Sequence, residues 1–243
     1  MLTSVRSLMA ATVLAGAALT ATPAMAQEDL GISVSGNAAI VTDYRFRGVG
    51  LSGGDPAIQG GIDIGTDAGF YIGTWGSSID GGPLYGEMEL DVYAGWGGEV
   101  TDGLGVDVGV LYYAYPANDF GPADYFEFYA SLSPSVGPAE FTFGVAYAPD
   151  QDSLASTDNL YLYADVGIGI PETPISVWGH VGYTDGFLTF TASGDAIDYG
   201  VGADLAIGEN LSLGISYVGV EDDGLNLTGV TDDTVLGTLA VSF

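Results

Sequence analysis

The sequence predicts an all-β protein: a transmembrane antiparallel β-barrel of about twelve strands. Three observations predict it. Apolar and polar residues alternate along most of the chain, an apolar composition is combined with a strong negative charge, and short connections between strands alternate with longer ones. Alternation with a period of two is typical of strands whose two faces meet different surroundings.

The segment from Glu87 to Trp96 shows the alternation best. Because successive side chains of a strand point to opposite faces, this segment presents one apolar face and one face of acidic, small and phenolic residues. The two sets are Met88, Leu90, Val92, Ala94 and Trp96 on the apolar face, and Glu87, Glu89, Asp91, Tyr93 and Gly95 on the other.

The composition indicates what the apolar face contacts. The chain has 243 residues, is 47% hydrophobic, and carries a formal net charge of -29. A soluble chain this acidic is usually more polar, so the composition favours contact with lipid. The excess of acid argues against nucleic acid as a partner. Cysteine is absent, which leaves no disulfide and no thiolate metal site.

Residues 1–26 are predicted to be a secretory signal peptide, and residues 27–243 the barrel domain. Arg6 supplies a positive start, Leu8 to Leu19 is an apolar stretch, and Ala24-Met25-Ala26 is a small-x-small cleavage site. The mature chain then keeps two arginines as its only basic residues, against 32 acidic ones. No later segment approaches the roughly 18–20 apolar residues that a spanning helix needs, so a membrane would be crossed by strands.

The predicted strands share the alternating pattern and are bounded by turn-forming residues. They are Ile32–Arg47, Ala57–Gly65, Phe70–Ser78, Glu87–Gly97, Leu104–Tyr115, Tyr125–Ser135, Phe141–Ala148, Leu160–Ile170, Ile175–Thr184, Ile197–Ile207, Leu211–Val220 and Thr234–Phe243.

The connections between these strands alternate in length. Short turns such as Thr101-Asp102-Gly103 and Gly208-Glu209-Asn210 follow the even-numbered strands, and longer loops such as 116–124 and 221–233 follow odd-numbered ones. Bacterial outer-membrane barrels have an even number of strands, short periplasmic turns and longer extracellular loops. Both termini are therefore predicted to lie in the periplasm.

Face assignment follows from the alternation. The predicted lipid face carries Ile32, Val34, Ile40, Tyr44, Phe46, Ile58, Ile62, Ile64, Val106, Val108, Val110, Leu160, Leu162, Val166, Ile168, Val201, Leu205, Ile207, Leu239, Val241 and Phe243. The opposite, pore-lining face collects Asp43, Arg45, Arg47, Asp63, Glu87, Glu89, Asp91, Asp107, Glu127, Asp165, Asp198 and Asp204. A charge facing lipid near mid-membrane costs about 2–4 kcal/mol for Arg and less for acids, which explains the segregation. The phase of the strand that holds Phe70, Tyr71, Ile72 and Trp75 is left open.

An exported soluble sandwich is the alternative fold, with the apolar faces meeting in a core. The regular alternation of short and long connections, the aromatic residues near strand ends and the terminal Phe243 favour the barrel.

The segment Thr42 to Ser78 resembles the opening of the TorF family of porin-like proteobacterial outer-membrane proteins. The matching elements are Asp43-Tyr44, Phe46-Arg47-Gly48, Asp55-Pro56-Ala57, Gln59-Gly60-Gly61, Gly69-Phe70-Tyr71 and Gly73-Thr74-Trp75. The chain departs from the family at Val49-Gly50-Leu51-Ser52 and in its scarcity of basic residues. The resemblance implies an outer-membrane pore, without an established substrate or catalytic residues.

Asp43, Arg45 and Arg47 share one face of the first predicted strand and are expected to pair with inward carboxylates. Their role is either a charged constriction or a structural brace of the wall. The remaining inward acids favour passage of cations or neutral solutes over anions. Inward aromatic residues either fill the lumen or form a stacking surface; they are Tyr93, Tyr113, Tyr115, Tyr125, Tyr129, Tyr161, Tyr163 and Trp178.

His180 is the only histidine and shares its predicted face with Ser176. No nucleophile elbow surrounds it, so a hydrolase is the least favoured function. The acidic loop segments Glu221–Gly224 and Thr231–Asp233 lack EF-hand spacing, and solvated loop charge is their default interpretation, with calcium binding as the alternative.

The sequence therefore predicts a porin-like outer-membrane channel for passive diffusion, with no enzymatic activity, cofactor, metal or catalytic residue. The alternative is a plugged barrel with a structural or surface-interaction role. Expected partners are outer-membrane lipid, lipopolysaccharide and small solutes, but not nucleic acid. Self-association as a homo-oligomer is compatible with the sequence, and no residue pattern decides it.

Overall fold

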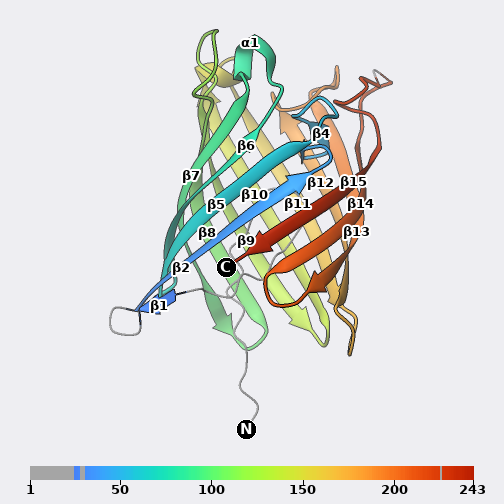
Figure 1. Cartoon of the computed structure of the whole chain (residues 1–243). Coiled ribbons are helices and arrows are strands. Elements are labelled where there is room, and N and C mark those ends of the chain that lie inside the picture. Colours follow the sequence, from blue (N-terminus) through green and yellow to red (C-terminus); the bar gives the residue numbers. More distant parts are fainter. Residues whose placement is uncertain (1–24, 28–30, 225) are drawn as a thin grey trace.

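A computed structural model of the chain describes residues 25–27, 31–224 and 226–243. Its architecture is a closed antiparallel barrel of 12 strands (Figure 1). The wall strands are β2 (Ile32–Val41), β5 (Ala57–Thr66), β6 (Phe70–Ser78), β7 (Met88–Thr101), β8 (Leu104–Ala114), β9 (Tyr125–Val136), β10 (Ala139–Gln151), β11 (Thr157–Gly169), β12 (Ile175–Gly186), β13 (Asp195–Ile207), β14 (Leu211–Val220) and β15 (Thr234–Ser242).

Closure joins the two ends of the sheet at β2. This strand pairs with β5 on one side, where Ile40 is opposite Ile58, and with β15 on the other, where Ile40 is opposite Leu239. Every wall strand therefore has two neighbours, which satisfies the backbone hydrogen bonds without a sheet edge and is required of strands surrounded by lipid. The closed sheet excludes the sandwich.

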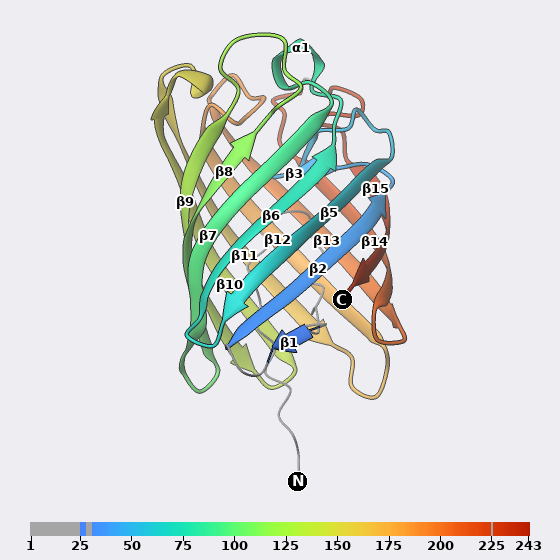
Figure 2. The same cartoon turned by 60° about the vertical axis from the view of Figure 1, so that its left-hand side comes forward.

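The connections have the predicted asymmetry. One end of the barrel carries the short turns, such as 67–69, 102–103 and 208–210, and the other end carries the longer loops with the single-turn helix α1 (Gly82–Tyr85) and the 3₁₀ turn η1 (Asp152–Leu154). In Figure 2, α1 lies at the upper end and the short turns at the lower end. We refer to the end with the long loops as the outer end.

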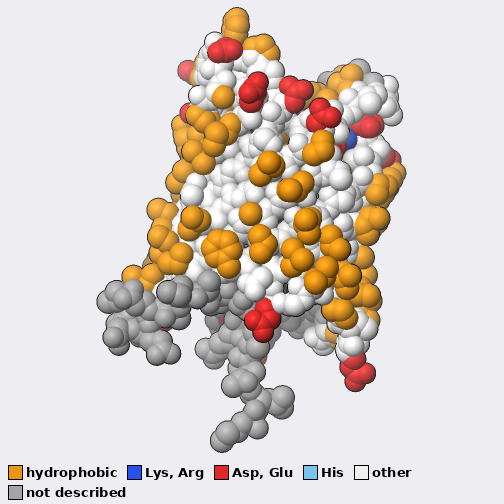
Figure 3. Space-filling model, in the orientation of Figure 1, with side chains coloured by type: hydrophobic (Ala, Val, Ile, Leu, Met, Phe, Trp, Pro, Cys, Tyr) orange, Lys and Arg blue, Asp and Glu red, His pale blue; other side chains and the backbone are white. Residues whose placement is uncertain are grey.

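The outward face of the wall is apolar. Val201, Ile215 and Val235 are 59%, 61% and 62% exposed, although all three lie within strands. In Figure 3, hydrophobic side chains are spread over the wall among backbone and uncharged polar atoms, whereas carboxylates lie at its upper and lower rims. Exposed apolar side chains over a whole wall fit a lipid contact and not a solvated surface.

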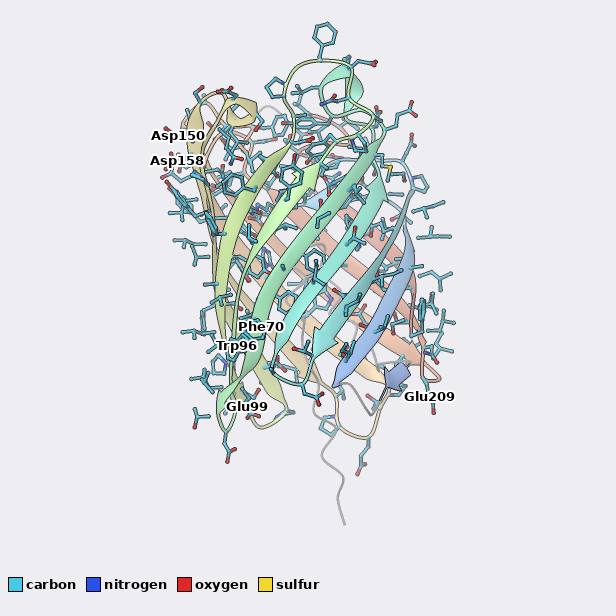
Figure 4. All side chains as sticks on the ribbon, turned by 90° about the vertical axis from the view of Figure 1, so that its left-hand side faces the viewer. Phe70, Trp96, Glu99, Asp150, Asp158 and Glu209 are labelled. Carbon is cyan, nitrogen blue, oxygen red and sulfur yellow. The ribbon has the colours of Figure 1, made fainter. Side chains whose placement is uncertain are left out.

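Labelled side chains in Figure 4 mark the limits of this apolar band. Phe70 and Trp96 are opposite one another in register and lie near the lower rim, above Glu99; Asp150 and Asp158 lie at the outer rim. Aromatic girdles at both interfaces are typical of outer-membrane barrels. The open phase of β6 is also decided: Phe70 and Ile72 are exposed on the outward face, whereas Trp75 is buried inside.

The first predicted strand is wrong beyond Val41. Here β2 ends, and the chain turns inward and forms a separate two-stranded sheet of β3 (Arg45–Phe46) and β4 (Val49–Gly50) inside the outer half of the barrel (Figure 2). Tyr44 and Phe46 were expected to face lipid; instead they are 0% and 8% exposed within the lumen. Local alternation continues through Arg47, so it could not reveal that the strand leaves the wall.

The predicted signal peptide, 1–26, lies outside the described residues except for Met25 and Ala26. These two belong to β1 (Met25–Gln27), which pairs with β2. Cleavage before Gln27 remains a prediction. Within the described part of the chain, no helix has the length and apolar character to cross a membrane.

Candidate functional site: the outer half of the lumen

The inward segment, residues 43–52, is the central feature of the lumen, and we call it the inward hairpin. β3 and β4 are joined by the two residues Arg47 and Gly48, which have φ angles of 49° and 77°. Positive φ at both central positions is typical of a type I′ turn. Glycine adopts this conformation freely, but arginine does so at a cost, and such strained residues persist where their surroundings hold them.

The base of the hairpin is closed by hydrogen bonds between its two arms. The Ser52 hydroxyl donates to the Asp43 carboxylate at 2.8 Å and accepts from the backbone N–H of Tyr44 at 2.8 Å. The N–H of Leu51 donates to the carbonyl of Tyr44, also at 2.8 Å. Residues 43 and 52 therefore lie side by side where the chain leaves and rejoins the wall.

Arg45 ties this base to the loop between β14 and β15. Its Nε donates to Asp43 at 2.6 Å, and its Nη2 donates to Asp232 at 3.1 Å. Its Nη1 donates to the carbonyl oxygens of Val230 and Asp232 at 3.1 Å and 2.9 Å. The guanidinium is nearly saturated, as expected for a buried arginine.

Arg47, at the tip, crosses the lumen to the opposite wall. Its Nη2 donates to both oxygens of Glu127 on β9, at 2.7 Å and 2.8 Å, and the side chains of both residues are almost fully buried. The guanidinium carbon also lies 4.2 Å from the ring centroid of Tyr161 on β11. The predicted pairing of the two arginines with carboxylates is confirmed.

Aromatic side chains fill the space between the hairpin and the wall. The ring of Tyr44 packs edge-on against Trp75 at 5.6 Å between centroids, and Phe46 against Tyr113 at 5.7 Å. Tyr113 in turn stacks on Tyr125 at 4.5 Å. The inward tyrosines of β8, β9 and β11 are thus predominantly space-filling here, in an apolar cluster that contains both hairpin aromatics.

The far side of the hairpin contacts β13, β14 and the loop after β14. A side-chain carbon added at Gly48 would lie 2.7 Å from the carbonyl oxygen of Gly219 and 3.0 Å from the Cβ of Asp198. The N–H of Gly50 donates to the carbonyl of Val230 at 2.7 Å. The hairpin therefore spans the lumen, with contacts on β6 to β9, on β11, and on β13 and β14.

Three carboxylates lie in the cluster beside Arg47. Glu89 accepts hydrogen bonds from the hydroxyls of Tyr44 at 2.7 Å and Tyr115 at 3.1 Å. Glu127 also accepts from Tyr113 at 2.6 Å. Asp91, between them in the same lumen, is 0% exposed, and neither of its carboxylate oxygens has a hydrogen-bond partner among the described residues. The cluster thus contains three carboxyl groups and one guanidinium.

His180 belongs to a second polar network at mid-barrel. Its Nδ1 lies 2.5 Å from Asp165, and its Nε2 lies 2.8 Å from Asp198 and 2.9 Å from the hydroxyl of Tyr161. Both ring nitrogens are engaged with acids and a phenol, and no serine hydroxyl contacts the ring among the described residues. A Ser-His pair needs that contact, so the geometry gives the hydrolase hypothesis no support.

Other predicted pore-lining acids also lie on the inward face of the wall, and two of them accept hydrogen bonds from tyrosines. Asp63 accepts from Tyr93 at 2.5 Å, Asp107 from Tyr71 at 2.8 Å, and Asp204 is half-buried on the inward face of β13. Glu87 does not belong to this set, because it is exposed in the turn before β7. The prediction that Glu87 lines the pore is wrong, because β7 begins at Met88, one residue after Glu87.

Sequence reasoning missed the hairpin and its partners outside the predicted strands, namely Ser52, Val230 and Asp232. The available signal was weak: Arg47-Gly48 between two apolar residues is a short turn pattern inside a longer alternating run. The contacts that hold it are up to 187 residues apart in sequence, and no local pattern reports them.

The described residues hold no cluster of three or more His, Asp or Glu side chains with metal-binding geometry. In the acidic outer loop, Asp222 accepts the N–H groups of Gly224 and Asn226 at 2.8 Å and 2.5 Å. These backbone hydrogen bonds lower the pKa of Asp222. The Asp222 carboxylate therefore stabilises the backbone conformation of this loop, as Asp side chains do in Asx turns.

A closed barrel with an apolar wall, short turns at one end and a charged, partly filled lumen defines a porin-like protein of the bacterial outer-membrane type. The family model for Gcw_chp, described as a bacterial protein of unknown function, matches residues 25–243, so the chain belongs to that family. Among solved structures it resembles the NanC porin, with a TM-score of 0.58 and 11% identity, over 86% of this chain and 98% of that one.

A second similar structure is the KdgM porin in complex with disordered oligogalacturonate. Its TM-score is 0.57 at 8% identity, over 86% of this chain and 97% of that one. At these identities the likeness establishes the fold alone. A comparison with curated proteins gives no match.

Acidification is expected to detach the outer loop from the hairpin base. Burial favours the neutral form of Asp232, but hydrogen bonds from Arg45 and from the N–H of Gly229 outweigh it and lower the pKa of this carboxyl. The ionised Asp232 therefore stabilises the docked loop fully above the ordinary carboxyl pKa of about 4. This stabilisation is lost as the pH falls through the lower pKa that Asp232 has in the folded protein. Hydrogen exchange of the Gly229 amide, corrected for intrinsic rate, should accelerate only in this acidic range.

Asp232→Asn is the matched control for that titration. It keeps the shape of the side chain but cannot ionise, so the amide should exchange faster at neutral pH and show no acid transition. An acid transition that survives in Asp232→Asn would assign the effect to another group.

Proposed function

We propose that the protein is an outer-membrane channel for passive diffusion of small solutes, and that its lumen favours cations and neutral solutes over anions. The observation that carries the proposal is the charge of the inward face. Asp63, Glu89, Asp91, Asp107 and Asp165 point into the lumen with further acids, against Arg45 and Arg47 on the hairpin. A passage lined by one sign of charge concentrates counter-ions and repels ions of the same sign.

Two similarities support a channel. The fold is that of the NanC and KdgM porins, and the segment Thr42 to Ser78 resembles the TorF porin-like family. The wall and the signal-like N-terminus support an outer-membrane location, with lipid and lipopolysaccharide around the barrel and small solutes within it. Neither similarity supplies a solute.

One observation favours a second candidate, a plugged barrel with a structural or surface-interaction role. The inward hairpin and the aromatic cluster cross the outer half of the lumen, and Tyr44 and Tyr113 are fully buried there. A hairpin that never leaves this position would obstruct the outer half of the lumen. Conductance therefore separates the two candidates.

Recording from the refolded mature protein in planar bilayers tests the proposal. We expect discrete conductance steps and, across a potassium chloride gradient, a reversal potential whose sign shows that potassium is more permeant than chloride. Glu209→Gln, in a turn at the far rim, is the control for a carboxylate outside the lumen and should leave selectivity unchanged. A reversal potential of the opposite sign would refute the argument from inward carboxylates.

A further inference from the structure

We propose that the inward hairpin, residues 43–52, is a gate: docked as in this structure it closes the barrel, Arg47 and Glu127 are its latch, and the buried carboxylate of Asp91 opposes closure. This inference rests on the proposed channel function and concerns its regulation. Three features of the structure carry it.

The first feature is that the hairpin can leave without damage to the wall. Its strands β3 and β4 form a sheet of their own and share no ladder with β2 or β5. β2 and β5 pair directly from Ile32 opposite Thr66 to Val41 opposite Ala57, and β2 also pairs with β15. Withdrawal of the hairpin therefore leaves the strand ladders of the wall intact. The backbone hydrogen bonds that it breaks, from the N–H of Gly50 to Val230 and from the N–H of Asp80 to Leu51, involve loop residues outside the wall strands.

The second feature is that the tip is held by side-chain contacts that water can replace. The Arg47 guanidinium is bound through a single nitrogen, Nη2, to Glu127, while its Nε and Nη1 have no hydrogen-bond partner among the described residues. A buried arginine that donates through one of its three nitrogens has much to gain from hydration. The Phe46 and Tyr161 rings on its faces add cation–π attraction but no hydrogen bonds.

The third feature is the unbalanced charge behind the docked hairpin. Asp91 is fully buried, has no hydrogen-bond partner among the described residues, and shares the cluster with Glu89 and Glu127, which already have partners. One oxygen of Asp198, next to the hairpin tip at Gly48, is also unpartnered in the described part of the chain. Burial of an unpaired carboxylate is unfavourable, and an open, hydrated lumen would relieve it.

These features give two isosteric substitutions opposite effects. In Glu127→Gln the amide keeps the shape but removes the carboxylate that binds the buried Arg47 guanidinium, so the docked state is weakened. In Asp91→Asn a buried, unpaired charge is removed from behind the hairpin, so the docked state is strengthened. Both residues lie inside the same cluster and both changes remove one negative charge, so a general effect of lumen charge would move both in one direction.

Single-channel recording of the two variants tests the gate. Relative to the natural protein, we expect the ratio of open to closed time to rise about tenfold or more in Glu127→Gln and to fall about tenfold in Asp91→Asn. The reason is that burial of one unpaired charge costs more free energy than a tenfold change in this ratio requires. Folding of each variant is checked by heat-modifiable migration in gels. Shifts in the same direction, or no shift in either correctly folded variant, would overturn the gate.

A shortened hairpin separates failure of the gate from failure of the channel. Residues 43 and 52 are already hydrogen-bonded to each other, so replacement of 44–51 by two glycines can bridge them without strain on the wall. This variant should conduct continuously. If it conducts while the two amide variants behave like the natural protein, the gate is wrong and the channel stands; if the folded shortened barrel does not conduct, the channel itself is wrong.

Discussion

Val201→Arg is expected to destabilise the barrel in a bilayer, with a free energy of unfolding about 2–4 kcal/mol smaller, because it places a charge on the outward face near the middle of β13. Val201 is 59% exposed at the centre of a strand that runs from Asp195 to Ile207. The measurement is the urea dependence of folding into lipid vesicles, compared with the natural protein.

Ser216→Arg is the matched control for this prediction. Ser216 is half-buried on the inward face of β14, opposite Gly202, the residue next to Val201 in β13. The same charge there faces a lumen rich in carboxylates, including Asp204, and should change the folding free energy by less than about 1 kcal/mol. Equal losses in the two variants would show that the two faces of the wall do not differ in their surroundings.

Arg47→Met is expected to release the inward hairpin. The substitution leaves Glu127 buried without a counter-charge, and removal of one partner from a buried ion pair costs about 3–5 kcal/mol. Because 1.4 kcal/mol corresponds to a factor of ten, the undocked population should rise about a hundredfold or more.

A single cysteine can report that population, since the natural chain has none. Val49 lies on β4, is 7% exposed and packs with Ala196 and Val220. The thiol of Val49→Cys should react slowly with a maleimide in the otherwise natural chain and about a hundredfold faster when Arg47→Met is added. Arg47→Lys keeps the charge but not the guanidinium geometry, and should give an intermediate rate. A rate that is unchanged in Arg47→Met would show that the pair does not hold the hairpin.

The inward hairpin also changes how the resemblance at Thr42 to Ser78 is understood. The alternating pattern predicts a wall strand that ends at Arg47, yet the Phe46-Arg47-Gly48 element is the tip of the hairpin, where Gly48 has no room for a side chain against Gly219. Its residue types follow from that position: an aromatic ring for the filled lumen, a cation for Glu127, and a glycine for the turn and close approach.

Much of the fold could be predicted from the sequence by itself. Alternation fixed which side chains of each wall strand face outward, because in a strand this depends only on residue parity. Connection length then ordered the strands into hairpins, and the near absence of charge on one face predicted that this face is apolar and turned outward. These are local properties, readable within about ten residues, and they place Asp63, Glu89, Asp91, Asp107 and Glu127 inside the barrel.

Only the tertiary structure decided where residues 43–52 go. The same alternating residues could continue β2 outward or fold inward, and the local pattern does not distinguish the two. The choice depends on partners far along the chain: Glu127 is 80 residues from Arg47, and Asp232 is 187 residues from Arg45. Contacts at such separation depend on how the whole barrel brings its strands together, so the apolar outward face of the wall could be predicted from the sequence, whereas the filling of the lumen could not.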